Sequence, residues 1–128
     1  MFTVDKKDVA KILVQFGVYG EVSGTEELLR YRYERDNPDS KEVRLILKVS
    51  FLDRAPMVVK FKNEDGVTQA MVQEQTAFSE HLASQGVPTA RYYRSEEGYV
   101  LRRTFNGYTV LITAEDFQPG EIKTVNPS

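Results

Sequence analysis

The fold is decided by a short stretch, Met57-Val58-Val59-Lys60-Phe61-Lys62, in which an apolar run carries a lysine near its middle. A β-strand points alternate side chains to opposite faces, so the two kinds of residue separate. One face carries Val58, Lys60 and Lys62, and the other face is wholly apolar. The stretch therefore predicts a strand in which a lysine is flanked by apolar surface. A helix is expected to follow it directly, over residues 67–84.

On the amino-terminal side the pattern predicts one helix and two strands. Residues 4–16 predict an amphipathic helix, because their apolar side chains recur at helical spacing and Gly17 follows. Strands are expected over residues 28–35 and 43–52. Apolar and charged residues alternate in the second of these, as in a sheet with one buried face. The cluster at 36–40, Asp-Asn-Pro-Asp-Ser, predicts the turn between them.

On the carboxy-terminal side three more strands are expected, over residues 90–94, 99–105 and 108–113. Asn106-Gly107 joins the last two, and this dipeptide between β-prone runs is a strong hairpin signal. The predicted fold class is α+β: an antiparallel sheet of about five or six strands with one central helix and an N-terminal helix.

Composition is that of one globular domain, residues 1–128. The chain is 41% hydrophobic and 28% charged, with a formal net charge of −2 and no cysteine. An acidic balance argues against a general nucleic-acid or membrane-surface binder, and the absence of cysteine excludes disulfides. We find no signal-peptide pattern and no run long enough to span a bilayer, so we expect a cytoplasmic protein that binds neither nucleic acid nor membrane.

Three short motifs in order give the chain a resemblance to a known family. They are the lysine strand followed by a helix carrying Glu74, then Gly86-Val87-Pro88, then Phe117-Gln118-Pro119-Gly120 after a hairpin. This series resembles the amino-terminal lobe of the aminoglycoside phosphotransferase and choline kinase group, which has the protein-kinase-like fold. The resemblance covers about residues 56–120. It implies an ATP-binding lobe of a small-molecule phosphotransferase.

The resemblance also implies roles for individual residues. Lys60 would contact the α- and β-phosphates of ATP, and Glu74 on the following helix would hold the lysine in place through a largely solvated ion pair. Glu80 is an alternative partner for Lys60. Val58 would pack on the purine. The backbone of the hinge would face the base, with the Asp116 carbonyl accepting, Phe117 between, and the Gln118 amide donating.

Two features depart from the family pattern. The phosphate-covering loop has two candidates, residues 20–25 and the turn at 36–40, and neither is glycine-rich in the usual way. Glu115 stands just before the hinge, where the group usually has an apolar residue.

The family's catalytic aspartate, asparagine and magnesium-binding aspartate are expected in a carboxy-terminal lobe outside these 128 residues. His81, the single histidine, has no aspartate near it and receives no role. We therefore expect a lobe that binds nucleotide without catalysing transfer, with magnesium supplied together with the missing lobe. Its partners would be the nucleotide, the missing lobe and, through an exposed apolar patch near Val58 and the hinge, a second copy of the chain.

Other functions also fit the sequence. Lys60 could be a solvent-facing residue of an ordinary sheet, and Glu74 a solvated charge on an exposed helix face. A non-enzymatic binding or protein-interaction module is the main alternative, either cystatin-like or a degenerate kinase lobe that has lost nucleotide binding. Since the hinge would contact the base through backbone groups, ATP and GTP both fit. The phosphate acceptor is open among aminoglycosides, choline, sugars and other hydroxyl compounds.

Overall fold

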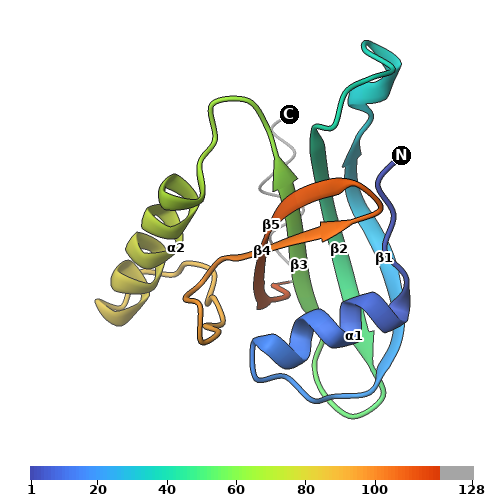
Figure 1. The fold of residues 1–128 in the computed structure, drawn as a ribbon. Coiled ribbons are helices and arrows are strands. Elements are labelled where there is room, and N and C mark those ends of the chain that lie inside the picture. The colour runs from blue at the N-terminus through green and yellow to red at the C-terminus, as the bar shows by residue number, and fades with distance from the viewer. Residues whose placement is uncertain (119–128) are drawn as a thin grey trace, which may run out of the picture.

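A computed structural model describes residues 1–118 and has an α+β architecture (Figure 1). The described chain contains two α-helices, one short 3-10 helix and five strands, so the predicted fold class is confirmed. In chain order the elements are α1 (Lys6–Gln15), β1 (Val22–Tyr31), η1 (Tyr33–Arg35), β2 (Val43–Phe51), β3 (Met57–Asn63), α2 (Gln69–Ser84), β4 (Leu101–Phe105) and β5 (Tyr108–Asp116).

The five strands form one antiparallel sheet in the order β1-β2-β3-β5-β4. The lysine strand β3 is central, with β2 on one side and β5 on the other. Lys60 stands opposite Ile46 on β2 and opposite Thr113 on β5. The register therefore surrounds the lysine with strand residues on both sides.

The hydrophobic core lies on the face of the sheet that α1 covers. Met57, Val59 and Phe61 are at most 1% exposed, as the alternation of β3 predicts. They pack with Val9 and Leu13 of α1, among others. Burying so much apolar surface is the main favourable term of folding, and here it fixes which face of β3 is left for Val58, Lys60 and Lys62.

The helix α1 begins at a capping box. The Asp5 carboxylate accepts from the Asp8 backbone N–H at 2.8 Å, and the Asp8 carboxylate accepts from the Asp5 N–H at 3.1 Å. These bonds satisfy backbone donors that have no partner inside the helix. The backbone bond to Asp8 holds the pKa of Asp5 below its usual value.

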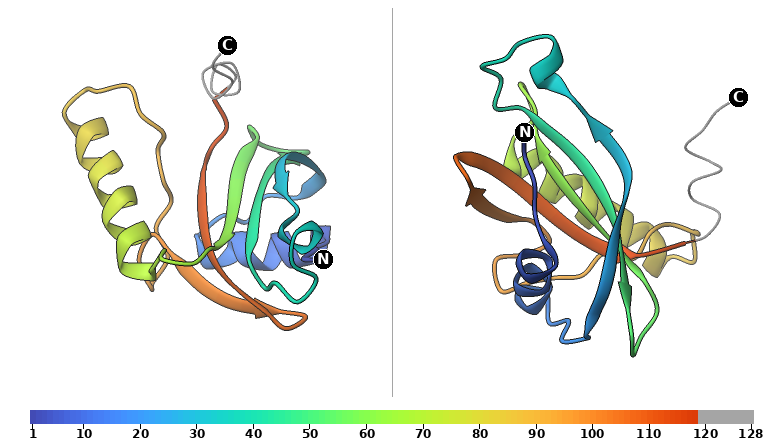
Figure 2. Two further views of the ribbon diagram at one scale, coloured as in Figure 1. Left: turned by 90° about the horizontal axis from the view of Figure 1, so that it is seen from above. Right: turned by 90° about the vertical axis from the view of Figure 1, so that its right-hand side faces the viewer.

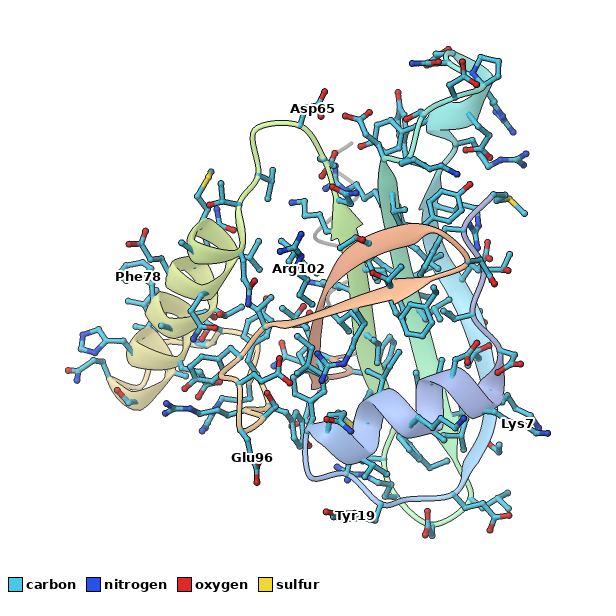
Figure 3. The ribbon with its side chains drawn as sticks, in the orientation of Figure 1. Lys7, Tyr19, Asp65, Phe78, Glu96 and Arg102 are labelled. Carbon is cyan, nitrogen blue, oxygen red and sulfur yellow. The ribbon has the colours of Figure 1, made fainter. Side chains whose placement is uncertain are left out.

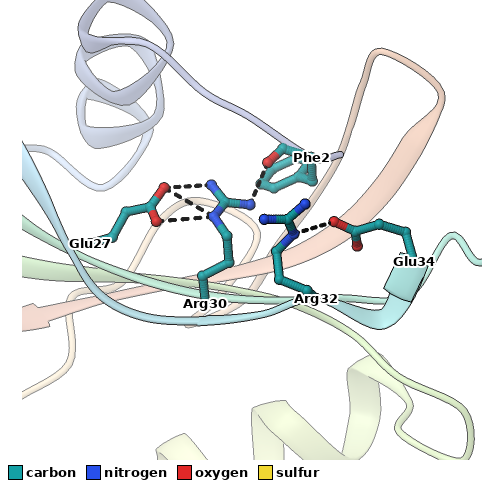
Figure 4. Close-up of polar contacts among 5 residues, drawn as sticks. All are labelled: Phe2, Glu27, Arg30, Arg32 and Glu34. Carbon is teal, nitrogen blue, oxygen red and sulfur yellow. Dashed lines mark hydrogen bonds and ion pairs between the residues drawn. The ribbon is translucent and has the colours of Figure 1, made fainter. Parts of the chain in front are cut away.

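The segment before α1 is tied to the first strand by an arginine (Figure 4). Arg30 donates from Nη1 to the Phe2 carbonyl at 2.7 Å and from Nη2 to Glu27 at 2.6 Å. Hydrogen bonding from Arg30 lowers the pKa of Glu27. The Phe2 ring lies 5.4 Å from that of Phe61 and is 4% exposed, so the terminus helps to close the core.

The helix α2 stands apart from the sheet, on a different side from α1 (Figures 1 and 2). Thr68 caps its start by accepting from the Met71 N–H at 3.2 Å. Polar contacts to the chain that follows hold it: Gln73 accepts from the Tyr99 N–H at 3.2 Å, and Thr89 donates to the Ser79 carbonyl at 3.0 Å. Thr76 is its one buried residue.

Four predicted strands differ from the observed ones by two residues or more, and one of them is β5, which ends at Asp116 rather than Thr113. The first begins at Val22 rather than Leu28 and ends at Tyr31, after which Tyr33–Arg35 form η1. Register shifts at Val22/Gly24 and Glu27/Leu29 interrupt the alternation there, so the period-two pattern failed. Residues 90–94 form no named strand and contribute only an isolated bridge between Tyr92 and Glu115. β4 begins at Leu101, two residues later than predicted.

The Asn106-Gly107 hairpin is confirmed. Both residues have positive φ, 52° and 85°, as a type I′ turn requires. Within residues 1–118 no helix combines the length and apolar character needed to cross a membrane.

Candidate functional site

One face of the sheet, turned toward α2, carries the candidate residues Val58 and Lys60, and we call it the inner face. Directly paired residues point the same way, so the inner face follows from the register. Its members on the three central strands are Arg44, Ile46 and Lys48 on β2, Val58, Lys60 and Lys62 on β3, and Leu111, Thr113 and Glu115 on β5.

A cavity of about 210 Å³ lies between the inner face and α2. Strand β2 contributes Arg44, and β3 contributes Lys60 and Lys62. The facing wall is neutral and includes Gln75 and Thr76 of α2. Within residues 1–118, three cations and no carboxylate line this cavity. Its potential is therefore suited to an anion.

Lys60 meets a carboxylate from the sheet rather than from the helix. Its Nζ lies 2.6 Å from Oε1 of Glu115 on the neighbouring strand. Val58 and Lys60 pair directly with Glu115 and Thr113, so the ion pair runs diagonally across β3 and β5 on one face. The Glu115 side chain is 1% exposed and that of Lys60 is 32% exposed. The pair is half-buried, with the lysine reaching the cavity and the carboxylate beneath it.

The predicted pairing of Lys60 with Glu74 is wrong. Glu74 is exposed on α2, and the ion pairs of residues 1–118 do not join it to Lys60. The reason is the side of α2 that faces the sheet: Val72 and Thr76 line the cavity, and Glu74, two residues from each, lies on the opposite side of the helix. Glu80, the other predicted partner, instead accepts from the Tyr92 N–H at 2.5 Å and lies 3.4 Å from Arg91.

Val58 and the start of the hinge lie at the other end of the inner face. Val58 is 2% exposed, so the exposed apolar patch expected around it does not form, and self-association stays a prediction. The Phe117 N–H donates to the Pro56 carbonyl at 3.2 Å, and Lys48 Nζ lies 4.3 Å from the Phe117 ring centre. Pro119 and Gly120, the rest of the predicted hinge, lie outside the described residues.

Side chains from the 89–94 segment hold the hinge in place. Tyr93 donates its hydroxyl to Asp116 at 2.6 Å and accepts from Arg54 at 2.9 Å. Burial and the bond to Asp116 raise the pKa of Tyr93. Gln118 donates from its side chain to the Thr89 carbonyl at 3.4 Å. The Asp116 side chain is therefore structural, while its backbone is the part assigned to the base.

Of the two candidates for a phosphate-covering loop, only the turn at 36–40 joins two strands. Residues 20–25 lie largely within β1, so that candidate is wrong. The turn belongs to the connection between β1 and β2. Residues just after β3 hold this connection: Tyr33 donates to Glu64, and Glu42 accepts from the Asp65 N–H at 3.2 Å. Burial first, and then the bond to Glu64, raise the pKa of Tyr33.

Sequence reasoning missed two residues of this site. Glu115 alternates with Leu111 and Thr113, and this spacing is the signal in the sequence that places it on the inner face. Arg44 is one of the charged residues that alternate with apolar ones over residues 43–52, and nothing in that pattern distinguishes it. Its direct pairing with Lys62 depends on the β2–β3 register, which a single sequence does not specify.

Comparison with protein-family models, with curated proteins and with solved structures finds no match to this chain. Among residues 1–118, no three His, Cys, Asp or Glu side chains gather as a metal ion would require.

Proposed function

We propose that the chain is an ATP-binding amino-terminal lobe of a small-molecule phosphotransferase, with Lys60 contacting the phosphates. The observation that carries this proposal is the cationic cavity between the inner face and α2, into which Lys60 reaches from the central strand. Phosphates need cationic donors, and a partly buried lysine supplies one with little competition from solvent.

The order of elements supports the same proposal. The lysine strand is third in the chain, α2 follows it directly, and a hairpin then leads through β5 to the hinge. This is the order of parts that the resemblance to small-molecule kinases implies. A cystatin-like module would instead begin with its helix and continue as a meander, whereas here α2 lies between β3 and β4.

In this proposal the base lies against the backbone of Asp116–Gln118, and the phosphates extend along β3 to Lys60. Val58 is 2% exposed, so its side chain does not offer the purine a surface. Glu115 takes the part assigned to Glu74: it holds the lysine ammonium at a fixed point on the inner face. Magnesium and the residues that orient the acceptor hydroxyl come from a carboxy-terminal lobe. The acceptor is held by that lobe, so this chain determines nucleotide binding alone.

Calorimetric titration of the 128-residue chain with ATP tests the proposal. We expect weak saturable binding that Lys60→Gln weakens about tenfold, because one charge-assisted contact is lost. Lys11→Gln is the matched control, since Lys11 is exposed on α1, which packs on the other face. Lys62, which shares the cavity, is unsuitable as a control. Binding that is absent, or that both variants weaken equally, would rule out this role for Lys60.

The Lys60–Glu115 pair also favours a second candidate, a degenerate lobe that serves protein contact. A lysine already neutralised by a buried carboxylate offers less charge to a phosphate. Met71 and Phe78 on α2 are 43% and 62% exposed, and Phe78 lies on the side turned away from the sheet (Figure 3). A chain that binds no nucleotide in the titration, but whose α2 binds a protein, would have this second function.

A further inference from the structure

The inner face places two cations directly opposite each other across β2 and β3. Arg44 pairs with Lys62 in the register, and both line the cavity beside Lys60. Like charges directly opposite on a sheet are destabilising. Within residues 1–118, no acidic side chain forms an ion pair with Arg44, so the repulsion is only partly offset.

Lys62 shares its acidic neighbour, Glu64, with Tyr33. Lys62 Nζ lies 3.5 Å from Oε1 of Glu64, while the other oxygen of Glu64 accepts from Tyr33. The carboxylate is thus already bound by the β1–β2 connection. With Lys60 held by Glu115, the cavity keeps a net positive lining that a bound anion would neutralise.

We propose that Arg44 and Lys62 bind the terminal phosphates of a nucleoside triphosphate, so that this cavity selects a triphosphate over a monophosphate. The inference rests on the proposed function and adds a subsite to it. The three cations occur in order along the sheet, with Lys60 nearer the hinge and the Arg44–Lys62 pair nearer the β1–β2 connection.

The spacing along β3 fits this order. Val58 and Lys62 are four residues apart, about 13 Å in an extended strand. A nucleotide laid along β3 has its base at the hinge, beyond the buried Val58, its first phosphates at Lys60 and its last phosphate between Arg44 and Lys62. An arginine suits that end, since its planar guanidinium bonds two phosphate oxygens at once.

The cavity volume agrees with a phosphate subsite rather than a whole-ligand site. About 210 Å³ falls below the roughly 300–1,000 Å³ usual for pockets that enclose an entire small molecule. Thr76, Thr113 and Gln75 add neutral hydrogen-bonding groups to the lining. The base would then lie outside the cavity, toward the hinge.

The test is a titration series of the 128-residue chain with ATP, AMP, inorganic tripolyphosphate and inorganic phosphate. We expect ATP to bind more tightly than AMP, and tripolyphosphate more tightly than phosphate. Arg44→Gln should weaken ATP and tripolyphosphate about tenfold and leave AMP nearly unchanged, because it removes one charge-assisted contact to the terminal phosphate.

Arg102→Gln is the matched control. Arg102 pairs with Leu111 on the same side of the sheet but does not line the cavity, and it undergoes the same change of charge. Thermal melting of the free variants checks the fold, and Arg44→Gln should melt at the wild-type temperature or above, because repulsion from Lys62 is relieved.

The outcomes separate the two proposals. Equal effects of Arg44→Gln and Arg102→Gln, or equal affinity for the long and short phosphates, would overturn the Arg44–Lys62 subsite even if ATP binds. Arg44-dependent binding of tripolyphosphate, with ATP no tighter than tripolyphosphate, would uphold the subsite and count against a nucleotide-binding lobe. A fall in the melting temperature of Arg44→Gln would mean that Arg44, opposite Lys62, stabilises the fold. That result would also overturn the subsite.

Discussion

At the scale of single residues, the ion pair between Lys60 and Glu115 determines how this site works. A carboxylate that is 1% exposed has lost nearly all its contact with water, and the lysine 2.6 Å away compensates for part of that loss. The pair is therefore unlike the solvated surface pair that the sequence predicted with Glu74. Lys60 therefore contributes to the stability of the folded chain.

Lys60→Met should consequently destabilise the chain, rather than leave its melting temperature unchanged. We expect a loss of about 2–3 kcal/mol, since the buried Glu115 carboxylate would lose its lysine, with a discount because Lys60 is partly exposed. Glu115→Gln should be milder. The double variant should recover part of the loss, and urea unfolding of all four proteins gives the coupling energy. Additive losses would show that the two side chains do not interact.

At the scale of elements, the β1–β2 connection is held by side chains rather than by its own backbone. Tyr33 on η1 donates to Glu64 at the end of β3, and Glu64 also lies 3.5 Å from Lys62. This network joins the connection to the cavity. The connection therefore reaches the cavity lining through Glu64 and Lys62.

Tyr33→Phe should loosen this connection. We expect a cost of about 1 kcal/mol at neutral pH, the usual worth of one hydrogen bond. Folding raises the pKa of Tyr33. The neutral phenol therefore makes its full contribution to stability below the unfolded-state pKa of about 10. This contribution is lost as the pH rises from there through the folded-state pKa. Stability measured from pH 8 upward should thus fall more steeply in the wild type than in Tyr33→Phe.

Tyr19→Phe is the control for that pH series, since Tyr19 is 77% exposed. It should retain the wild-type slope. A Tyr33→Phe chain with the same slope as the wild type would show that Tyr33 does not carry the effect.

The β4–β5 hairpin gives a second element-scale prediction. Gly107 has φ of 85°, a conformation that costs an L-residue about 1 kcal/mol, and no atom lies within 4 Å of an added Cβ. Gly107→Ala should lower the free energy of unfolding by about that amount. Gly24→Ala, in β1 with equally open space, should not lower it. Equal losses would mean that φ is not the cause.

Periodicity and turn chemistry were enough to predict most helices and strands, but they did not predict the contacts between these elements. Both α-helices, β2, β3 and the Asn106-Gly107 hairpin follow from periodicity and turn chemistry. The first strand did not, because two register shifts break its alternation. The partner of Lys60 depends on which side of α2 faces the sheet and on the β3–β5 register. Both are properties of tertiary packing, which a single sequence does not specify.

At the scale of the whole molecule, the described chain contains a cavity lined by three cationic side chains. His81 is exposed on α2, and residues 1–118 bring together no cluster of metal ligands. Positioning and charge stabilisation by metal ions carry most of phosphoryl-transfer catalysis, and the proposed function assigns both to a carboxy-terminal lobe.

The 128-residue chain by itself should therefore show no magnesium-dependent phosphoryl transfer from ATP to an aminoglycoside, choline or sugar. A radiolabelled γ-phosphate assay measures this directly. Turnover above that of the Lys60→Gln control would contradict the assignment of catalysis to a second lobe.

ATP bound along the inner face would change the environment of named backbone amides, which a two-dimensional ¹H–¹⁵N NMR titration of the chain with ATP detects. We expect the amide shifts of Val58, Lys60, Lys62, Arg44 and Phe117 to move, while the amides of α1 stay in place. Shifts confined to α1 or to the outer side of α2, or a spectrum that ATP leaves unchanged, would contradict binding along the inner face.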